Sequence, residues 1–186
     1  MTAGPQLDRL QNSVVTMMFD CVQLHDPVEP LEFGLTGDFG GLFCACIGTP
    51  EDVDEAVFVV FTLPRYGSTV FLGLTRGKER EVARLLANLE DLERERSRAL
   101  GVGETIGLDI GGVLGKAFPP PAVILLPVAT SSLLSRLPPK ADLAGREVRF
   151  ALAVPLSEQE LRCLNAEGLD ALLDLFQQTE KSLFLA

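Results

Sequence analysis

The most regular part of the sequence is residues 148–176, VRFALAVPLSEQELRCLNAEGLDALLDLF. Its apolar first third predicts a buried strand, and we expect Pro155 to end that strand because proline cannot donate to a strand ladder. Ser157 and Glu160 then match the S-x-x-E capping box, in which each side chain accepts a hydrogen bond from a backbone N–H at the start of a helix. The pattern therefore predicts a strand followed by a helix that begins at residues 155–157.

Leucines at helical spacing extend this segment into a second helix. Gly168 is placed to end the first helix, and the apolar residues of LDALLDLFQQ recur three and four positions apart. The side chains that we expect to face inward are Leu161, Cys163, Leu164, Leu169, Leu172, Leu173 and Phe176. The regularity of this strand, helix and helix unit is thus explained by packing.

Two more helices are predicted nearer the N-terminus. Residues 6–18 carry apolar side chains at helical spacing, although residues 14–21 would also serve as a strand, and residues 78–100 form the longest amphipathic segment. One face of this long segment carries Val82, Leu85, Leu86, Leu89 and Leu92. Its charged remainder predicts a solvated face with the pairs Glu90–Arg94 and Glu93–Arg96, and a partner-binding surface is the alternative interpretation.

The apolar runs between these helices predict strands. AVFVVFTLP at residues 56–64 has β-branched and aromatic residues at both parities, which is typical of a central strand buried on both faces. PPAVILLPVA predicts a second buried strand, and RYGSTVFLGLTRG predicts a short hairpin or loop. Residues 21–48 predict short strands broken by Pro27, Pro30 and the turn GDFGG. The apolar runs are at most about half of the roughly 20 residues that a membrane helix needs, so we expect no membrane partner.

The chain is acidic, and its charge is unevenly distributed. The 186 residues carry a formal net charge of −10, and residues 1–60 contain ten acidic side chains against one basic side chain. This argues against a nucleic-acid ligand, because phosphate binding needs clustered Lys and Arg. Four neighbouring carboxylates, Glu51, Asp52, Asp54 and Glu55, are the candidate site for a basic protein partner, since opposite charge accelerates association. Solubility alone is the alternative explanation.

The sequence contains no evident catalytic constellation. His25 is the only histidine, and neither a G-x-S-x-G elbow nor a G-x-x-x-x-G-K-[ST] phosphate loop is present. Cys44 and Cys46 are close enough to begin a metal site, but tetrahedral zinc needs four ligands, and we expect both to pack in the core. A small hydrolase that uses Cys44 or Cys46 with His25 is the enzymatic alternative. The four cysteines and the missing signal peptide favour the cytoplasm.

Three motifs in the second half of the chain carry a family resemblance. They are GETI at residues 103–106, AVILLPV at residues 122–128, and the V-P-L, E-x-E and G-x-x-A-L-L elements of residues 148–176. In these motifs the chain resembles the bacterial suppressor-of-fused-like domain family, and weaker matches begin at residue 19. The residues that match the family pattern, which we interpret as fold-determining, are Pro64, Thr105, Pro127, Pro155 and Glu160.

The resemblance implies one compact α+β domain over residues 1–186, with a mixed, mostly antiparallel sheet flanked by helices. It also implies no enzyme activity, and we expect no cofactor and no metal. Animal relatives bind and restrain a transcription factor, and some small bacterial members neutralise toxins as immunity proteins. The leading hypothesis is therefore a protein-binding module, an immunity protein against a basic toxin. A structural homodimer is a further alternative.

Overall fold

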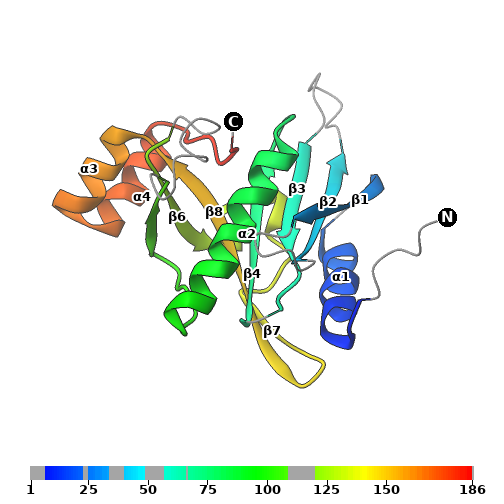
Figure 1. The fold of residues 1–186 in the computed structure, drawn as a ribbon. Helices are drawn as coiled ribbons and strands as arrows, with labels where there is room; N and C mark the ends of the chain where they lie inside the picture. The colour runs from blue at the N-terminus through cyan, green and yellow to red at the C-terminus, as the bar shows by residue number, and fades with distance from the viewer. Residues whose placement is uncertain are drawn as a thin grey trace.

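A mixed β-sheet forms the centre of the protein (Figure 1). The computed structural model describes residues 7–22, 25–33, 40–48, 57–65, 67–108 and 120–185. The strands in these ranges are β1 (His25–Phe33), β2 (Gly40–Gly48), β3 (Val57–Thr62), β4 (Thr69–Thr75), β5 (Thr105–Gly107), β6 (Ala122–Pro127), β7 (Lys140–Leu143) and β8 (Arg146–Leu156). The helices are α1 (Arg9–Cys21), α2 (Glu79–Arg96), α3 (Glu158–Glu167) and α4 (Leu169–Gln178), with the short 3-10 helices η1 (Val128–Thr130) and η2 (Ser132–Leu134).

The sheet is open and mostly antiparallel. Its strand order is β1-β2-β3-β4-β8-β6-β5, and β7 pairs with β8. β4 and β8 are parallel neighbours, whereas the other neighbouring strands of the described ranges run antiparallel. The predicted fold class, a single compact α+β domain with a mixed sheet flanked by helices, is confirmed.

Helices cover both faces of the sheet (Figure 1). α2 lies on one face and buries the predicted apolar stripe there, with Val82, Leu85, Leu86 and Leu89 at most 1% exposed. On the other face, Met18 of α1 and Phe176 of α4 belong to a second core. Successive residues of one strand divide between the two cores, as Val60 and Phe61 do in β3, because strand side chains alternate in direction. The predicted burial of β3 on both faces is confirmed.

β4 corrects the prediction of a short hairpin or loop at residues 65–77. Every residue from Thr69 to Thr75 is buried, and the strand lies in the middle of the sheet. The run TVFLGLT is bounded by Gly67 and Gly77 and contains Gly73, and glycines are typical of turns and loops, so the local pattern favoured a hairpin or loop. In the structure Gly73 allows close packing of β4 against α2, because a Cβ there would lie 2.5 Å from Cγ1 of Val82.

Prolines inside strands account for two further corrections. Pro155 does not end its strand: β8 continues to Leu156, and α3 begins at Glu158 with Ser157 as its N-cap. The pairing of β8 with β4 stops at Leu152, so the missing N–H of Pro155 is tolerated on that edge. Pro27 and Pro30 likewise lie within β1 instead of breaking it, and β1 is an edge strand of the sheet.

The remaining elements follow the predictions more closely. The Ser157–Glu160 capping box is present, and Gly168 ends α3 with a φ of +90°, a left-handed conformation that favours glycine. Leu172 and Phe176 of α4 are buried, as expected. Strand β7, which forms a hairpin with β8, was not predicted. None of the helices in the described ranges is long and apolar enough to cross a bilayer.

Candidate functional site

Two buried carboxylates lie near the end of α2. Glu90 and Glu93 are 7% and 3% exposed, which corrects the prediction of a solvated face at these positions. They are three residues apart and therefore share one side of the helix, where the connection between β3 and β4 passes. The neighbouring Arg94 forms its ion pair with Asp91 at 3.2 Å.

These carboxylates hold the β3–β4 connection by hydrogen bonds. Oε1 of Glu90 accepts from the backbone N–H of Arg65 at 2.6 Å. Oε1 of Glu93 accepts from the hydroxyl of Thr69 at 2.7 Å and from the backbone N–H of Leu100 at 2.8 Å. Glu93 thus links β4 to the segment that follows α2.

The second oxygen of Glu93 has no hydrogen-bond partner among the described residues. It lies against the backbone of Gly67, where an added Cβ would clash with it. Burial raises the pKa of Glu93, and the hydroxyl of Thr69, the N–H of Leu100 and the positive charge of Arg149 oppose that rise only in part. The carboxyl therefore takes up a proton more readily than an exposed glutamate does.

A hollow of about 400 Å³ opens beside this carboxylate. Its lining consists of Gly67, Ser68, Glu93, Arg94, Ser97, Arg98 and Ala99. The wall carries hydroxyl, guanidinium and carboxyl groups, and the guanidinium of Arg98 forms an ion pair with Glu104 across the turn. Such a wall can accept a polar side chain of another protein, because it offers both donors and acceptors.

A second, shallow hollow of about 680 Å³ follows the outer side of α1. Its lining consists of Arg9, Asn12, Ser13, Thr16, Met17, Asp20 and Leu143. Ser13 and Thr16 donate their hydroxyl protons to backbone carbonyls one turn earlier in the helix, which leaves the oxygens available as acceptors. Phe19 on the same helix is 47% exposed. This part of α1 therefore combines polar groups with an exposed aromatic ring.

The residues predicted to bind a partner are not among those that the structure describes. Glu51, Asp52, Asp54 and Glu55 fall between the end of β2 and the start of β3, outside the described ranges. The structure therefore leaves this site as a prediction.

The candidate nucleophile and base of the hydrolase alternative lie on neighbouring strands. His25 begins β1, Cys44 and Cys46 belong to β2, and the antiparallel register pairs the Cα atoms of His25 and Cys46. In the part of the chain that the structure describes, no group of three or more His, Cys, Asp or Glu residues could hold a metal ion.

The residues interpreted as fold-determining lie at strand and helix ends. Pro64 is buried just after β3, Thr105 begins β5 and Pro127 ends β6. Glu160 accepts from the backbone N–H of Ser157 at 2.7 Å and forms an ion pair with Lys181 at 2.8 Å. Each has a structural partner or position that explains it without catalysis.

The fold defines an α+β domain in which one mixed sheet is covered by helices on both faces. The model of the family Suppressor of fused protein (SUFU) matches residues 59–185, which is more than half of the chain, and the chain belongs to this family. The resemblance expected from the sequence motifs is therefore confirmed. No curated protein matches the sequence.

Two solved structures share the fold. One is described as a SUFU homolog from Neisseria gonorrhoeae: it is 17% identical, with a TM-score of 0.67, and the match covers 94% of this chain and 92% of that one. The other is the crystal structure of a Sufu–Fu complex: it is 13% identical, with a TM-score of 0.56, and the match covers 90% of this chain and 82% of that one. At these identities the matches show a common fold.

Proposed function

We propose that this chain is a non-enzymatic protein-binding module. The observation that carries the proposal is the family match over residues 59–185. A structure with the same fold is that of a Sufu–Fu complex, which gives an example of such a domain in contact with another protein. The two surface hollows named above offer polar donors and acceptors of the kind found in protein interfaces.

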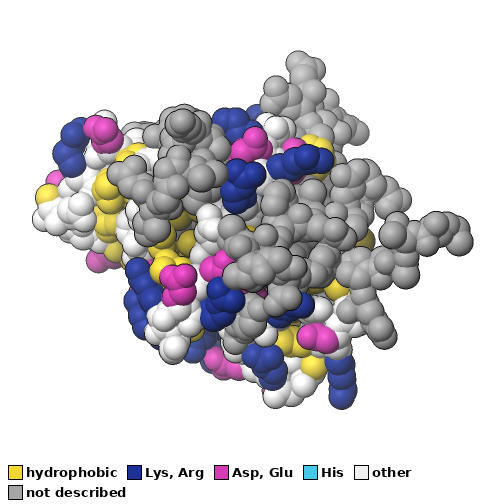
Figure 2. All heavy atoms as spheres, in the orientation of Figure 1, with side chains coloured by type: hydrophobic (Ala, Val, Ile, Leu, Met, Phe, Trp, Pro, Cys, Tyr) yellow, Lys and Arg dark blue, Asp and Glu magenta, His cyan; other side chains and the backbone are white. Residues whose placement is uncertain are grey.

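The partner that we propose is a basic protein, and the leading case is a toxin that the chain neutralises. Residues 1–60 account for nine of the ten net negative charges. The described part of the face in Figure 2 shows Lys and Arg side chains interspersed with Asp and Glu, so the acidic excess does not come from that part. An acidic segment in a chain whose other described side chains are mixed in charge favours electrostatic steering of a basic partner to that segment.

A pair of charge-reversal variants tests this proposal. In the first, Glu51, Asp52, Asp54 and Glu55 become lysine. In the matched control, the exposed carboxylates of α3 and α4 become lysine: Glu158, Glu167, Asp170 and Asp174. Both variants change the net charge equally, so the comparison isolates the position of the charges.

The measured quantity is the association rate with a captured basic partner at several salt concentrations. We expect the first variant to associate at least about tenfold more slowly at low salt and to lose most of its salt dependence, because steering is lost. The control variant should change the rate much less. Equal effects of the two variants would refute the acidic segment as the binding site and leave only general charge attraction.

A cysteine-dependent hydrolase is the second candidate, and the pairing of His25 with Cys46 across β1 and β2 favours it. Cysteine nucleophiles need a neighbouring base, and His25 is the only histidine of the chain. The His25→Ala variant and the unchanged protein should be assayed with generic ester and peptide substrates. Hydrolysis that disappears with His25 would favour the enzyme over the binding module.

A further inference from the structure

A short segment after α4 enters the central sheet. The pairing of β4 with β8 runs from Thr69 to Leu72, and the last residues of β4 lie beyond it. At that point the backbone N–H of Leu185 donates to the carbonyl of Leu74 at 2.8 Å, and Phe184 forms a parallel bridge with Leu74. The segment therefore occupies a strand position beside β4.

The side chains of this segment fill both cores. Leu185 is fully buried in the core beneath α2, whereas Leu183 and Phe184 pack against the core of the opposite face. The hydroxyl of Thr75 donates to the carbonyl of Leu185 at 2.8 Å, which adds a second polar contact to β4. Residues 183–185 thus pack into both faces of the sheet, as the residues of a central strand do, although the segment is only a few residues long.

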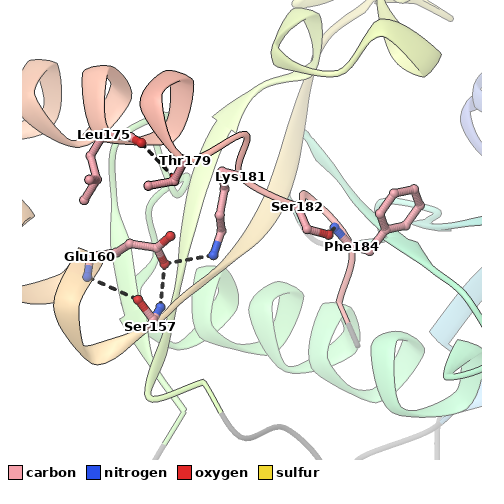
Figure 3. A network of polar contacts seen from close by, with 7 residues as sticks. All are labelled: Ser157, Glu160, Leu175, Thr179, Lys181, Ser182 and Phe184. Carbon is pink, nitrogen blue, oxygen red and sulfur yellow. Dashed lines mark hydrogen bonds and ion pairs between the residues drawn. The ribbon is translucent and has the colours of Figure 1, made fainter.

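The other end of the segment is attached to α3 (Figure 3). The ammonium of Lys181 lies 2.8 Å from Oε2 of Glu160, and both side chains are largely buried. Between this ion pair and α4, Glu180 has a φ of +48°, a conformation that non-glycine residues adopt rarely. In Figure 3 the chain runs from Lys181 past Ser182 to Phe184 without a helix or a long strand.

We propose that residues 181–185 form a reversible latch that undocks from β4 while the sheet and the helices remain folded. Undocking opens a strand-shaped apolar slot beside β4, and the occupant that fits this slot is the latch itself. The reason is the small number of hydrogen bonds to β4: a single bridge at Phe184, which includes the Leu185 N–H bond to Leu74, and the bond from the Thr75 hydroxyl. The neighbouring β6 and β8, by contrast, are joined over six residue pairs. Segments with few backbone bonds open locally, well before global unfolding.

Gly73 of β4 contributes to the site where the latch docks. A Cβ at this position would lie 3.0 Å from Cδ1 of Leu185, so the glycine of β4 makes room for the latch. Arg76 completes the docking site, since its guanidinium lies 4.5 Å from the ring centroid of Phe184, within the range of a cation–π contact. The receiving surface is therefore shaped for this segment by residues of β4 and the turn that follows it.

Amide hydrogen exchange on the unmodified protein tests the latch directly. The reporter is the amide of Leu185, bonded to Leu74, and the reference is the amide of Leu125 in β6, bonded to Glu104. Local undocking predicts exchange at least about tenfold faster at Leu185 than at Leu125, after correction for intrinsic rates. Equal protection of the two amides would overturn the proposal, because the segment would then open only when the whole domain unfolds.

A peptide with the sequence KSLFL, that of residues 181–185, tests the slot. The full chain carrying Leu185→Ser should bind this peptide at least about tenfold more tightly than the unmodified chain, in which the tethered latch competes at a high effective concentration. Val102→Ser is the control variant, since Val102 is 53% exposed and distant in sequence from the slot. A peptide with both Phe184 and Leu185 replaced by serine should not bind. Equal binding of KSLFL to all three proteins, or none to the Leu185→Ser chain, would contradict an open slot.

Discussion

Replacing Glu93 by alanine is the strongest test of the carboxylate that holds the β3–β4 connection. The change removes the acceptor of the Thr69 hydroxyl and of the Leu100 N–H, both in a buried site. An unsatisfied buried donor costs about 1–3 kcal/mol, and relief from burying the carboxylate offsets part of the sum. We therefore expect the Glu93→Ala variant to lose about 2–4 kcal/mol of unfolding free energy.

Urea unfolding monitored by circular dichroism at pH 7 measures this loss as a shift in midpoint at constant slope. Glu95→Ala is the matched control, because Glu95 is an exposed carboxylate on the same helix and its loss should cost no more than about 0.5 kcal/mol. Glu93→Gln keeps one acceptor oxygen for both donors and should lose less than Glu93→Ala. A Glu93→Ala variant as stable as the Glu95→Ala variant would refute the assigned role.

The pH dependence of the same variants gives an independent check. The pKa of Glu93 is raised in the folded protein by burial, so the folded state holds the proton more tightly than the unfolded chain does. The stability linked to this group is fully present below the unfolded pKa of 4.5 and is lost as the pH rises through the folded pKa. Stability profiles of the unmodified protein and of Glu93→Gln should therefore diverge above pH 4.5. Parallel profiles across that window would contradict a buried, titrating carboxyl.

Two further predictions concern the second half of the chain. Burial alone would raise the pKa of Glu160, but the ammonium of Lys181 and the N–H of Ser157 hold it below its usual value. The stability that Glu160 contributes is therefore present above the unfolded pKa of 4.5 and is lost as the pH falls through the folded pKa. Glu160→Gln should flatten the acid side of the stability profile, and an unchanged acid side would count against the ion pair. Gly73→Ala should destabilise the fold by about 1–3 kcal/mol through overpacking against Val82, whereas Gly107→Ala, which meets no atom within 4 Å, should have a much smaller effect in the same thermal unfolding assay.

Local patterns in the sequence predict the parts of this fold whose neighbours are close in sequence. The capping box of Ser157 and Glu160 and the apolar stripe of α2 each depend on residues three or four positions apart, and both were predicted. β4 was missed because its burial depends on parallel pairing with β8, about 80 residues later, which no local alternation reveals.

The buried carboxylates of α2 were missed for a related reason. Spacings of three and four residues between Glu and Arg occur on exposed helices, so the pattern alone does not separate a buried glutamate from a solvated one. A signal was nevertheless present: Glu90 and Glu93 follow Leu86 and Leu89 by four residues and thus extend the apolar stripe of the helix. Recognising it required knowing that the β3–β4 connection passes there.

The central claim is that this chain binds a basic protein through its acidic first third. Its most direct test is capture from the source cells at low salt with the unmodified protein and, in parallel, with the variant in which Glu51, Asp52, Asp54 and Glu55 are lysine. The bound proteins are then eluted with rising salt and identified by mass spectrometry. We predict one stoichiometric basic protein that the unmodified chain retains, salt releases and the variant fails to capture. A protein captured equally by both, or no stoichiometric partner at all, would contradict the claim.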